Sequence, residues 1–166
     1  MSAGGKTLRI DIKLDKALSD QIVALGGEIE RKVVRSTAYA GAQVIYAEVL
    51  RNVPVLDGLL KSAIYHAYAD ALSVDGRQVY RVSWNYRKAP HGHLVEFGHW
   101  RINKAYYKDG KLYFTKERLK QPVWVAPKSF IRKSADALPR ANQAMLERAA
   151  VRLKEALQEM RNGQNN

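Results

Sequence analysis

Apolar and polar positions along the chain change their period several times, and each period predicts a different element. Residues 7–13 alternate between apolar and polar side chains, which predicts a half-buried strand. Beyond them, apolar residues recur every three or four positions, at Leu18, Ile22, Leu25, Ile29 and Val33. This spacing predicts one apolar face along a helix. Gly26 and Gly27 interrupt that face, so we expect a short helix before them and a long one over 28–51.

The central part of the chain predicts strands. Pro54 ends the long helix because it cannot donate a backbone hydrogen bond and restricts the residue before it. Two strand-like runs follow at 60–69 and 77–86, and Asp75-Gly76 between them fits a hairpin connection. Pro90 and Gly98 bound a further short apolar stretch, for which we expect a short helix.

The second half predicts a hairpin and a helix. Asp109-Gly110 lies between two aromatic, strand-prone runs and predicts a two-residue hairpin turn. The length and polarity of 99–125 predict an arm that projects from the body. After Pro139 the chain predicts a C-terminal helix whose buried face would hold Leu146, Ala149, Leu153, Leu157 and Met160.

Together these elements predict an α+β fold. We expect the long N-terminal helix and the C-terminal helix to pack on a small antiparallel sheet, with a protruding basic β-hairpin arm. The 166 residues fit one domain over 1–166, with flexible tails at 1–6 and 163–166. No internal repeat suggests a second unit.

Composition narrows the class of protein. Hydrophobic residues make up 46% of the chain, as in ordinary globular proteins. The apolar runs fall short of the ~18 residues that a membrane span needs, and the N-terminus has no apolar segment typical of a secretory signal. The absence of cysteine excludes disulfides, thiol nucleophiles and cysteine-ligated zinc.

Positive charge is concentrated in one segment. The chain has 28 Lys and Arg against 16 Asp and Glu, a net charge of +12. Residues 97–133 hold ten of the basic and two of the acidic residues, so +8 of the excess lies there. A local patch of this kind is typical of proteins that meet a polyanion, which could be nucleic acid, an acidic protein surface or anionic lipid.

Histidines around the short helix raise the question of a metal site. His93, Glu96 and His99 share roughly one helical face, and His91 is close by. Against a metal, His91 and His93 flank a flexible glycine, and Gly98 would turn His99 away from the helix. No second acidic or histidine cluster supplies a general base. We therefore expect Glu96 to bind a neighbouring cation or backbone amide, while Leu94, Val95 and Phe97 anchor the helix.

Motifs for catalysis are missing from the sequence. There is no G-x-S-x-G nucleophile elbow, no phosphate-binding loop and no G-x-G-x-x-G dinucleotide fingerprint. We expect no enzyme activity, no catalytic residue, no metal and no cofactor. A metal-dependent hydrolase built on the histidines stays the least favoured alternative.

Three short motifs, in this order and spacing, resemble the tail-completion, or minor tail component, family of tailed bacteriophages. The first maps onto Val53, Pro54, Val55, Gly58, Leu60 and Ser62. The second maps onto Val95, Glu96, Phe97 and Gly98, and the third onto Ser129, Phe130, Ile131 and Ala135. The resemblance covers roughly 18–157. It departs from the family at Asp57 and His99, where threonine is common, and in the longer, more basic segment 100–125.

The resemblance implies a structural virion protein and no enzyme. It would be made in the bacterial host cytoplasm and reside in the neck of the virion. The family's role implies a homo-oligomeric, usually six-fold, ring at the head–tail junction. Its partners would be a head-closure or connector protein and a tail terminator or tail-tube protein, with non-specific DNA in the channel and no membrane.

Contact residues are expected in the arm. Basic and aromatic side chains alternate there, and we expect them to face a neighbouring protein or DNA: Trp100, Arg101, Lys104, Tyr106, Lys108, Lys111, Lys116, Arg118, Lys120 and Trp124. The alternative function is a basic DNA-binding module that uses the hairpin within 97–133 as a ribbon in a groove or as a stacking platform.

Overall fold

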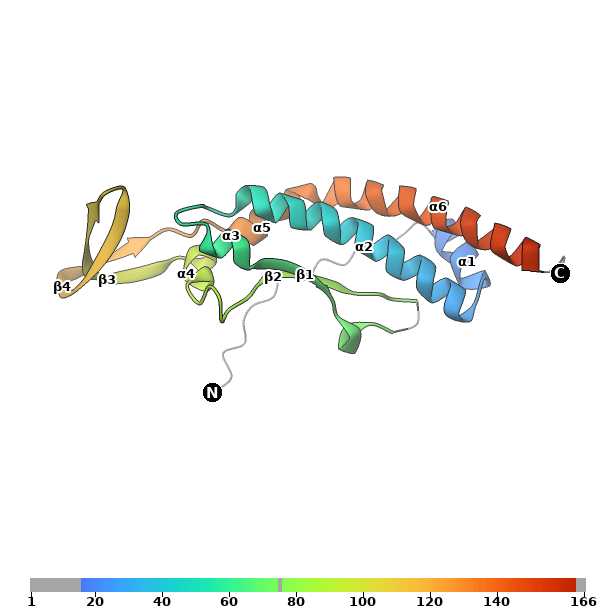
Figure 1. Cartoon of the computed structure of the whole chain (residues 1–166), viewed down its shortest axis with the longest axis horizontal. Helices are drawn as coiled ribbons and strands as arrows, with labels where there is room; N and C mark the ends of the chain where they lie inside the picture. The colour runs from blue at the N-terminus through green and yellow to red at the C-terminus, as the bar shows by residue number, and fades with distance from the viewer. Residues whose placement is uncertain (1–15, 75, 164–166) are drawn as a thin grey trace.

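The computed structural model describes residues 16–74 and 76–163, and it confirms an α+β fold with antiparallel pairing. Figure 1 shows an elongated body of helices and one small sheet, with a hairpin extending from one end. The elements in chain order are α1 (Lys16–Ala24), α2 (Gly27–Asn52), α3 (Leu59–Ala63), β1 (Ile64–Tyr68), η1 (Asp70–Leu72), β2 (Tyr80–Trp84), α4 (Gly92–Phe97), β3 (His99–Lys108), β4 (Lys111–Val125), α5 (Phe130–Lys133), η2 (Ser134–Ala137) and α6 (Leu138–Gly163). Within the described ranges, no helix combines the length and apolar character of a membrane span.

The long helices α2 and α6 lie side by side along the body (Figure 1). Small residues allow the approach: a Cβ placed on Gly41 would lie 2.6 Å from the Met145 sulfur. Ala141 and Ala149 of α6 are fully buried. Because interiors are close-packed, helices faced with alanine and glycine can come closer than helices faced with leucine.

The buried row of α6 differs from the predicted one. Met145, Ala149 and Ala156 are buried, whereas Leu157 and Met160, which the sequence pattern places in the row, are 52% and 39% exposed. At the close spacing of these helices the contact face accepts mainly small side chains. The larger residues of the last turns therefore lie at the edge of the contact and remain open to solvent.

The short helix and the long helix predicted on either side of Gly26 and Gly27 are confirmed as α1 and α2. Ile22 of α1 and Val33 of α2 are buried together, with Leu25 and Ile29 half-buried beside them. The two helices separate at Gly26 and Gly27, whose positive φ angles of 64° and 53° favour glycine. The Leu18 side chain and the strand expected at 7–13 lie outside the described residues.

The small sheet consists of β1 and β2. They pair antiparallel, with Ile64 opposite Trp84 and Tyr68 opposite Tyr80, and pack on α2. The predicted first strand was too long, since its first residues form α3. Leu60 and Ala63 are both buried at helical spacing, and Asp57 supports this helix start by accepting a hydrogen bond from the Leu59 amide at 2.9 Å.

The main core lies where α2, α3, the sheet and α5 meet. Phe130 of α5 is fully buried there, and its ring lies edge-on to Trp84 with 5.9 Å between ring centroids. Val49 of α2 and Leu60 of α3 belong to the same buried cluster as Phe130. This core is at the end of the body from which the hairpin extends, so it holds both chain segments that lead into the hairpin.

Candidate functional site

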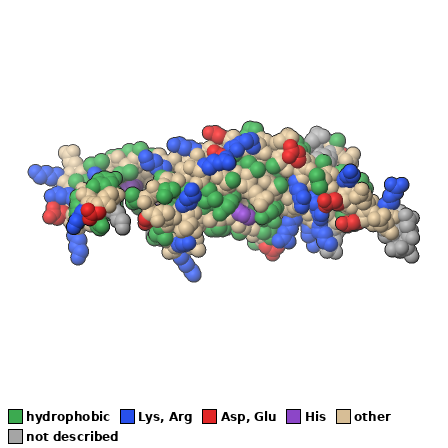
Figure 2. All heavy atoms as spheres, turned by 45° about the horizontal axis from the view of Figure 1, so that its top comes forward, with side chains coloured by type: hydrophobic (Ala, Val, Ile, Leu, Met, Phe, Trp, Pro, Cys, Tyr) green, Lys and Arg blue, Asp and Glu red, His purple; other side chains and the backbone are tan. Residues whose placement is uncertain are grey.

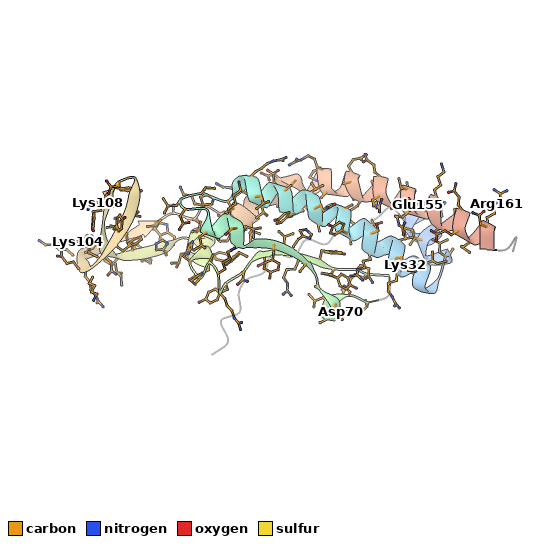
Figure 3. All side chains as sticks on the ribbon, viewed as in Figure 1. Lys32, Asp70, Lys104, Lys108, Glu155 and Arg161 are labelled. Carbon is orange, nitrogen blue, oxygen red and sulfur yellow. The ribbon has the colours of Figure 1, made fainter. Side chains whose placement is uncertain are left out.

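The projecting hairpin, which we call the arm, consists of β3 and β4. Each strand contacts mainly the other, and the pair extends away from the body in Figure 1. The predicted turn is confirmed: Lys108 pairs with Lys111, and Asp109 and Gly110 between them have positive φ angles of 51° and 73°. In Figure 3, Lys104 and Lys108 mark the arm at one end of the molecule, and Arg161 marks the opposite end.

Bulges divide the arm into a base and a tip. β4 has 15 residues and β3 has 10, so β4 must bulge where the register shifts. The shifts lie between Arg101 and Asn103 and between Asn103 and Ala105 of β3. Since bulges bend a strand and increase its twist, the tip turns away from the line of the base (Figure 1).

Two aromatic pairs lie across the strands. Trp100 and Trp124 pair at the base with ring centroids 5.3 Å apart, and Tyr106 and Tyr113 stack at the tip at 5.6 Å. Exposure alternates along β3, so that Trp100, Lys104 and Tyr106 lie on its exposed side. The aromatic rings support the ribbon and also remain open to a partner, with Trp100 63% exposed.

The arm is also cationic. Lys104 donates a hydrogen bond to Glu117 at 2.7 Å, and this contact lowers the pKa of Glu117. No carboxylate partner is found among the described residues for the other basic side chains that the structure describes here, which are Arg101, Lys108, Lys116, Arg118 and Lys120. Figure 2 shows Lys and Arg side chains projecting at the arm end, and others along the body.

Glu96 fastens the root of the arm. Its side chain is only 2% exposed, and its carboxylate accepts hydrogen bonds from the backbone amides of Ile131 and Arg132 at 2.9 and 3.2 Å and from Nε of Arg132 at 3.1 Å. The guanidinium also donates to the Glu96 carbonyl oxygen at 2.7 Å. α4 leads into β3 and α5 follows β4, so these bonds tie together the two ends of the hairpin. We call them the root clamp.

Close packing reinforces the clamp at Gly98. A Cβ there would lie 2.8 Å from both the Trp124 ring and the Val125 carbonyl oxygen, and the φ angle of Gly98 is +77°. The Lys128 amide donates to the Val95 carbonyl oxygen at 2.8 Å, directly across the root. The motif Val95 to Gly98 thus sets where the arm leaves the body. The expected contact of Glu96 with a cation and backbone amides is confirmed.

The first motif forms a fixed loop between α2 and α3. Gly58 adopts a left-handed conformation, with φ of 80°, directly before α3. The Ser62 hydroxyl donates to the Leu59 carbonyl oxygen at 2.8 Å. Pro54 is exposed next to two large apolar side chains, Val55 at 62% and Leu56 at 70% exposure. The sequence pattern does not reveal this exposure, since aliphatic residues in a short loop are usually assigned to the core.

The histidines around α4 have separate surroundings. Nδ1 of His93 donates to the Pro90 carbonyl oxygen at 2.7 Å, while Glu96 is occupied by α5. Among the residues that the structure describes, no three His, Cys, Asp or Glu side chains gather as a metal site would require.

Comparison with known protein families gives a match across half of the chain. Residues 16–98 match the model of a family described as "Bacteriophage HK97-gp10, putative tail-component". The match includes the first two motifs and ends at Gly98, where the arm begins. No curated protein and no solved structure matches the chain.

Proposed function

Since the chain belongs to the HK97-gp10-like family of bacteriophage tail components, we propose that it is a structural protein of the head–tail junction. In this proposal its copies form a closed ring, six-fold as the resemblance to tail-completion proteins implies. The ring joins the tail terminator or tail tube to the head-closure connector and surrounds the channel that DNA crosses.

The observation that carries the proposal is the exposed arm. An isolated two-stranded hairpin is marginally stable in water, and monomeric proteins rarely leave large apolar patches uncovered. The large apolar side chains exposed on the arm are Trp100, Ile102, Tyr106, Tyr107, Tyr113, Phe114, Val123 and Trp124. At roughly half of the 150–250 Å² that an aromatic side chain can bury, the six aromatic residues among them would supply on the order of 600 Å² over the two faces of the hairpin. This is most of the roughly 800 Å² that one partner contributes to a standard protein interface.

The root clamp fits an arm that acts in assembly. A contact residue binds best when its scaffold already holds it in place, because less freedom is then lost on association. Glu96 and Gly98 fix the departure of the arm, so its aromatic pairs reach a neighbour in a set direction. Bulges between base and tip shape the arm to that neighbour.

Complementation of a phage that lacks this protein tests the proposal. The triple variant Trp100→Ala, Tyr106→Ala, Trp124→Ala should lower the yield of infective particles about tenfold or more, because each lost central aromatic contact costs on the order of 2 kcal/mol. Free heads and unattached tails should accumulate in electron micrographs. The control is Tyr86→Ala, which removes an exposed tyrosine of the body. Normal, infective particles formed without the protein would refute the proposal.

DNA is the second candidate partner of the arm, since five described basic side chains there lack a carboxylate partner. Contacts to phosphates would be independent of sequence and sensitive to salt. The variant Lys108→Gln, Lys116→Gln, Lys120→Gln should reduce the slope of log affinity against log salt by about 3. If the unaltered protein binds no duplex at low salt, the basic side chains serve a protein neighbour.

A further inference from the structure

We propose that neighbouring copies join head to tail through the loop between α2 and α3. The exposed aliphatic side chains Val55 and Leu56 of this loop, with Leu59 at the start of α3, form what we call the apical knob. The knob would insert into the groove between α1 and α6 of the next copy. This inference rests on the proposed ring and names a contact within it that does not involve the arm.

The apical knob is exposed, and a hydrogen bond within the turn holds its backbone. Val55 and Leu56 are 62% and 70% exposed, although the residues that bound the loop, Val53 and Leu60, are buried. Asp57 accepts a hydrogen bond from the Leu59 amide, which fixes the turn from within. A loop held in this way presents its aliphatic side chains in one conformation, so little freedom is lost when they are buried by a partner.

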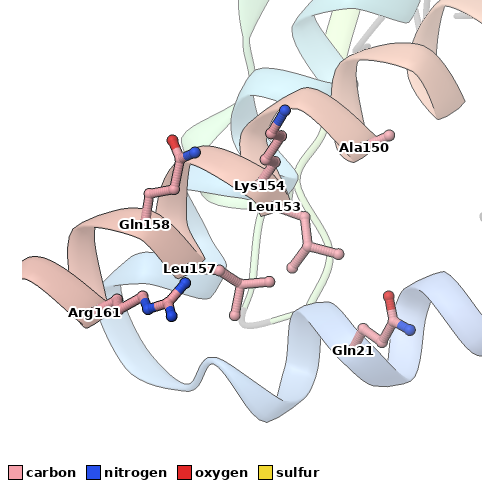
Figure 4. A pocket seen from close by; sticks show the side chains of 7 residues that line it. All are labelled: Gln21, Ala150, Leu153, Lys154, Leu157, Gln158 and Arg161. Atoms are coloured by element: carbon pink, nitrogen blue, oxygen red, sulfur yellow. The ribbon is translucent and has the colours of Figure 1, made fainter.

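The receiving groove lies at the other end of the body. Figure 4 shows Leu153 and Leu157 of α6 facing the open space beside α1, which contributes Gln21. Ala150 belongs to the same lining, and Leu157 is 52% exposed. The floor is therefore apolar, while Lys154, Gln158 and Arg161 supply a polar, basic rim.

Size and charge favour the apical knob as the occupant. Aliphatic side chains from one turn suit an open furrow between two helices, whereas the broad, Trp-rich ribbon of the arm does not. The basic rim at Lys154 and Arg161 would repel the cationic arm. It would attract Asp57, which adjoins the knob and has one carboxylate oxygen left after Oδ1 bonds the Leu59 amide.

The positions of knob and groove lead to a head-to-tail assembly. The loop before α3 and the last turns of α6 lie toward opposite ends of the body (Figure 1). A copy that inserts its knob still offers its own groove to a third copy. Such heterologous contacts repeat, and they close into a ring when the rotation between copies allows it. The contact is small, so we expect the ring to need the adjoining virion proteins for its formation.

Disulfide trapping in virions tests the contact, because the chain contains no cysteine. In the variant Leu56→Cys, Leu157→Cys, oxidation should link neighbouring copies into a ladder of covalent oligomers, since a disulfide forms only when Cα atoms are about 4.4–6.8 Å apart. The control Leu56→Cys, Val151→Cys uses an exposed residue of α6 that does not line the groove. It should remain monomeric on a non-reducing gel.

The outcomes separate this inference from the proposed function. Infective virions that contain the Leu56→Cys, Leu157→Cys variant but yield only monomer after oxidation would overturn the apical knob contact and leave the junction role intact. Infective virions that form without the protein altogether would contradict the junction role itself. As a second measurement, Leu157→Asp should reduce incorporation into particles at least about tenfold, with an unchanged thermal midpoint, whereas Val151→Asp should not. Normal incorporation of Leu157→Asp would also overturn the contact.

Discussion

The helical body and the arm hold their side chains by different means. In the body, α2 and α6 bury small and aliphatic residues along their length, and Val49, Ala141 and Ala149 are fully enclosed. In the arm, the largest side chains remain exposed and touch mainly one another. The body therefore has a core of its own, whereas the arm is held mainly by the pairing of its two strands and by its root. Substitutions in the body and in the arm should therefore have different effects on stability.

The largest effect on stability is expected at the root clamp. Glu96→Ala leaves two buried backbone amides and the Arg132 guanidinium without their carboxylate. Loss of one partner from a buried charged contact costs about 3–5 kcal/mol, and Arg132 is half exposed, so we expect about 3 kcal/mol. Unfolding in urea measures this loss in the free energy of unfolding. The matched control Glu117→Ala breaks an exposed pair within the arm and should leave the midpoint unchanged. A neutral Glu96→Ala would mean that the clamp does not stabilise the fold.

The next effect separates crowding from backbone strain. Gly98→Ala adds a methyl group against the Trp124 ring and the Val125 carbonyl oxygen and places alanine at positive φ. We expect a loss of about 2 kcal/mol by urea unfolding. Gly110→Ala at the tip meets a similar φ with no atom within 4 Å of the new methyl group. It should have the smaller effect, confined to the arm, and equal losses at both positions would show that crowding at the root is unimportant.

A stabilising substitution is expected within the body. The Thr37 hydroxyl is buried, and no described residue bonds it. Thr37→Val keeps the shape and removes this unpaired polar group, so the free energy of unfolding should rise by about 1 kcal/mol. Differential scanning calorimetry should show a higher thermal midpoint. A drop would indicate that the hydroxyl has a partner in solution.

The smallest effect distinguishes two carboxylates by their response to acid. Hydrogen bonds from Arg140, and secondarily from Arg51, lower the pKa of Glu48, which links α6 to α2. A lowered pKa means that the ionised form stabilises the fold at neutral pH, and this contribution is lost as the pH falls through the lowered value. The thermal midpoint should therefore fall less between about pH 5 and about pH 3 in Glu48→Gln than in the unaltered protein. Glu117→Gln, in the arm, should leave the pH dependence of global unfolding unchanged.

Local signals explain what the sequence predicted. The glycine pair at 26–27 and the Asp109-Gly110 turn impose backbone geometry on their own neighbours, and both appear where expected. The strand predicted over 60–69 was wrong at its start because Leu60 and Ala63 fit either period in so short a run. The third motif supplied the partner of Glu96, but the contact spans 35 residues of sequence. Periodicity carries no information at that separation.

Features that depend on how two neighbouring elements pack could not be predicted from the sequence. The shift of the buried row on α6 follows from how closely α2 approaches, which the α6 sequence does not encode alone. The bulges of β4 depend on its pairing with a shorter strand. Exposure of Leu56 depends on the direction in which the chain leaves α2. Each of these is a property of two segments together.

The turn of the arm lies between the two long helices in the sequence, with α2 before it and α6 after it. A single protease cut at Gly110 would give one fragment that contains α2 and another that contains α6. These helices pack along their length, and the bonds between Glu96 and Arg132 also join the two fragments. The nicked molecule should therefore stay associated, with the two halves of the arm held to the body by the fragments to which they belong.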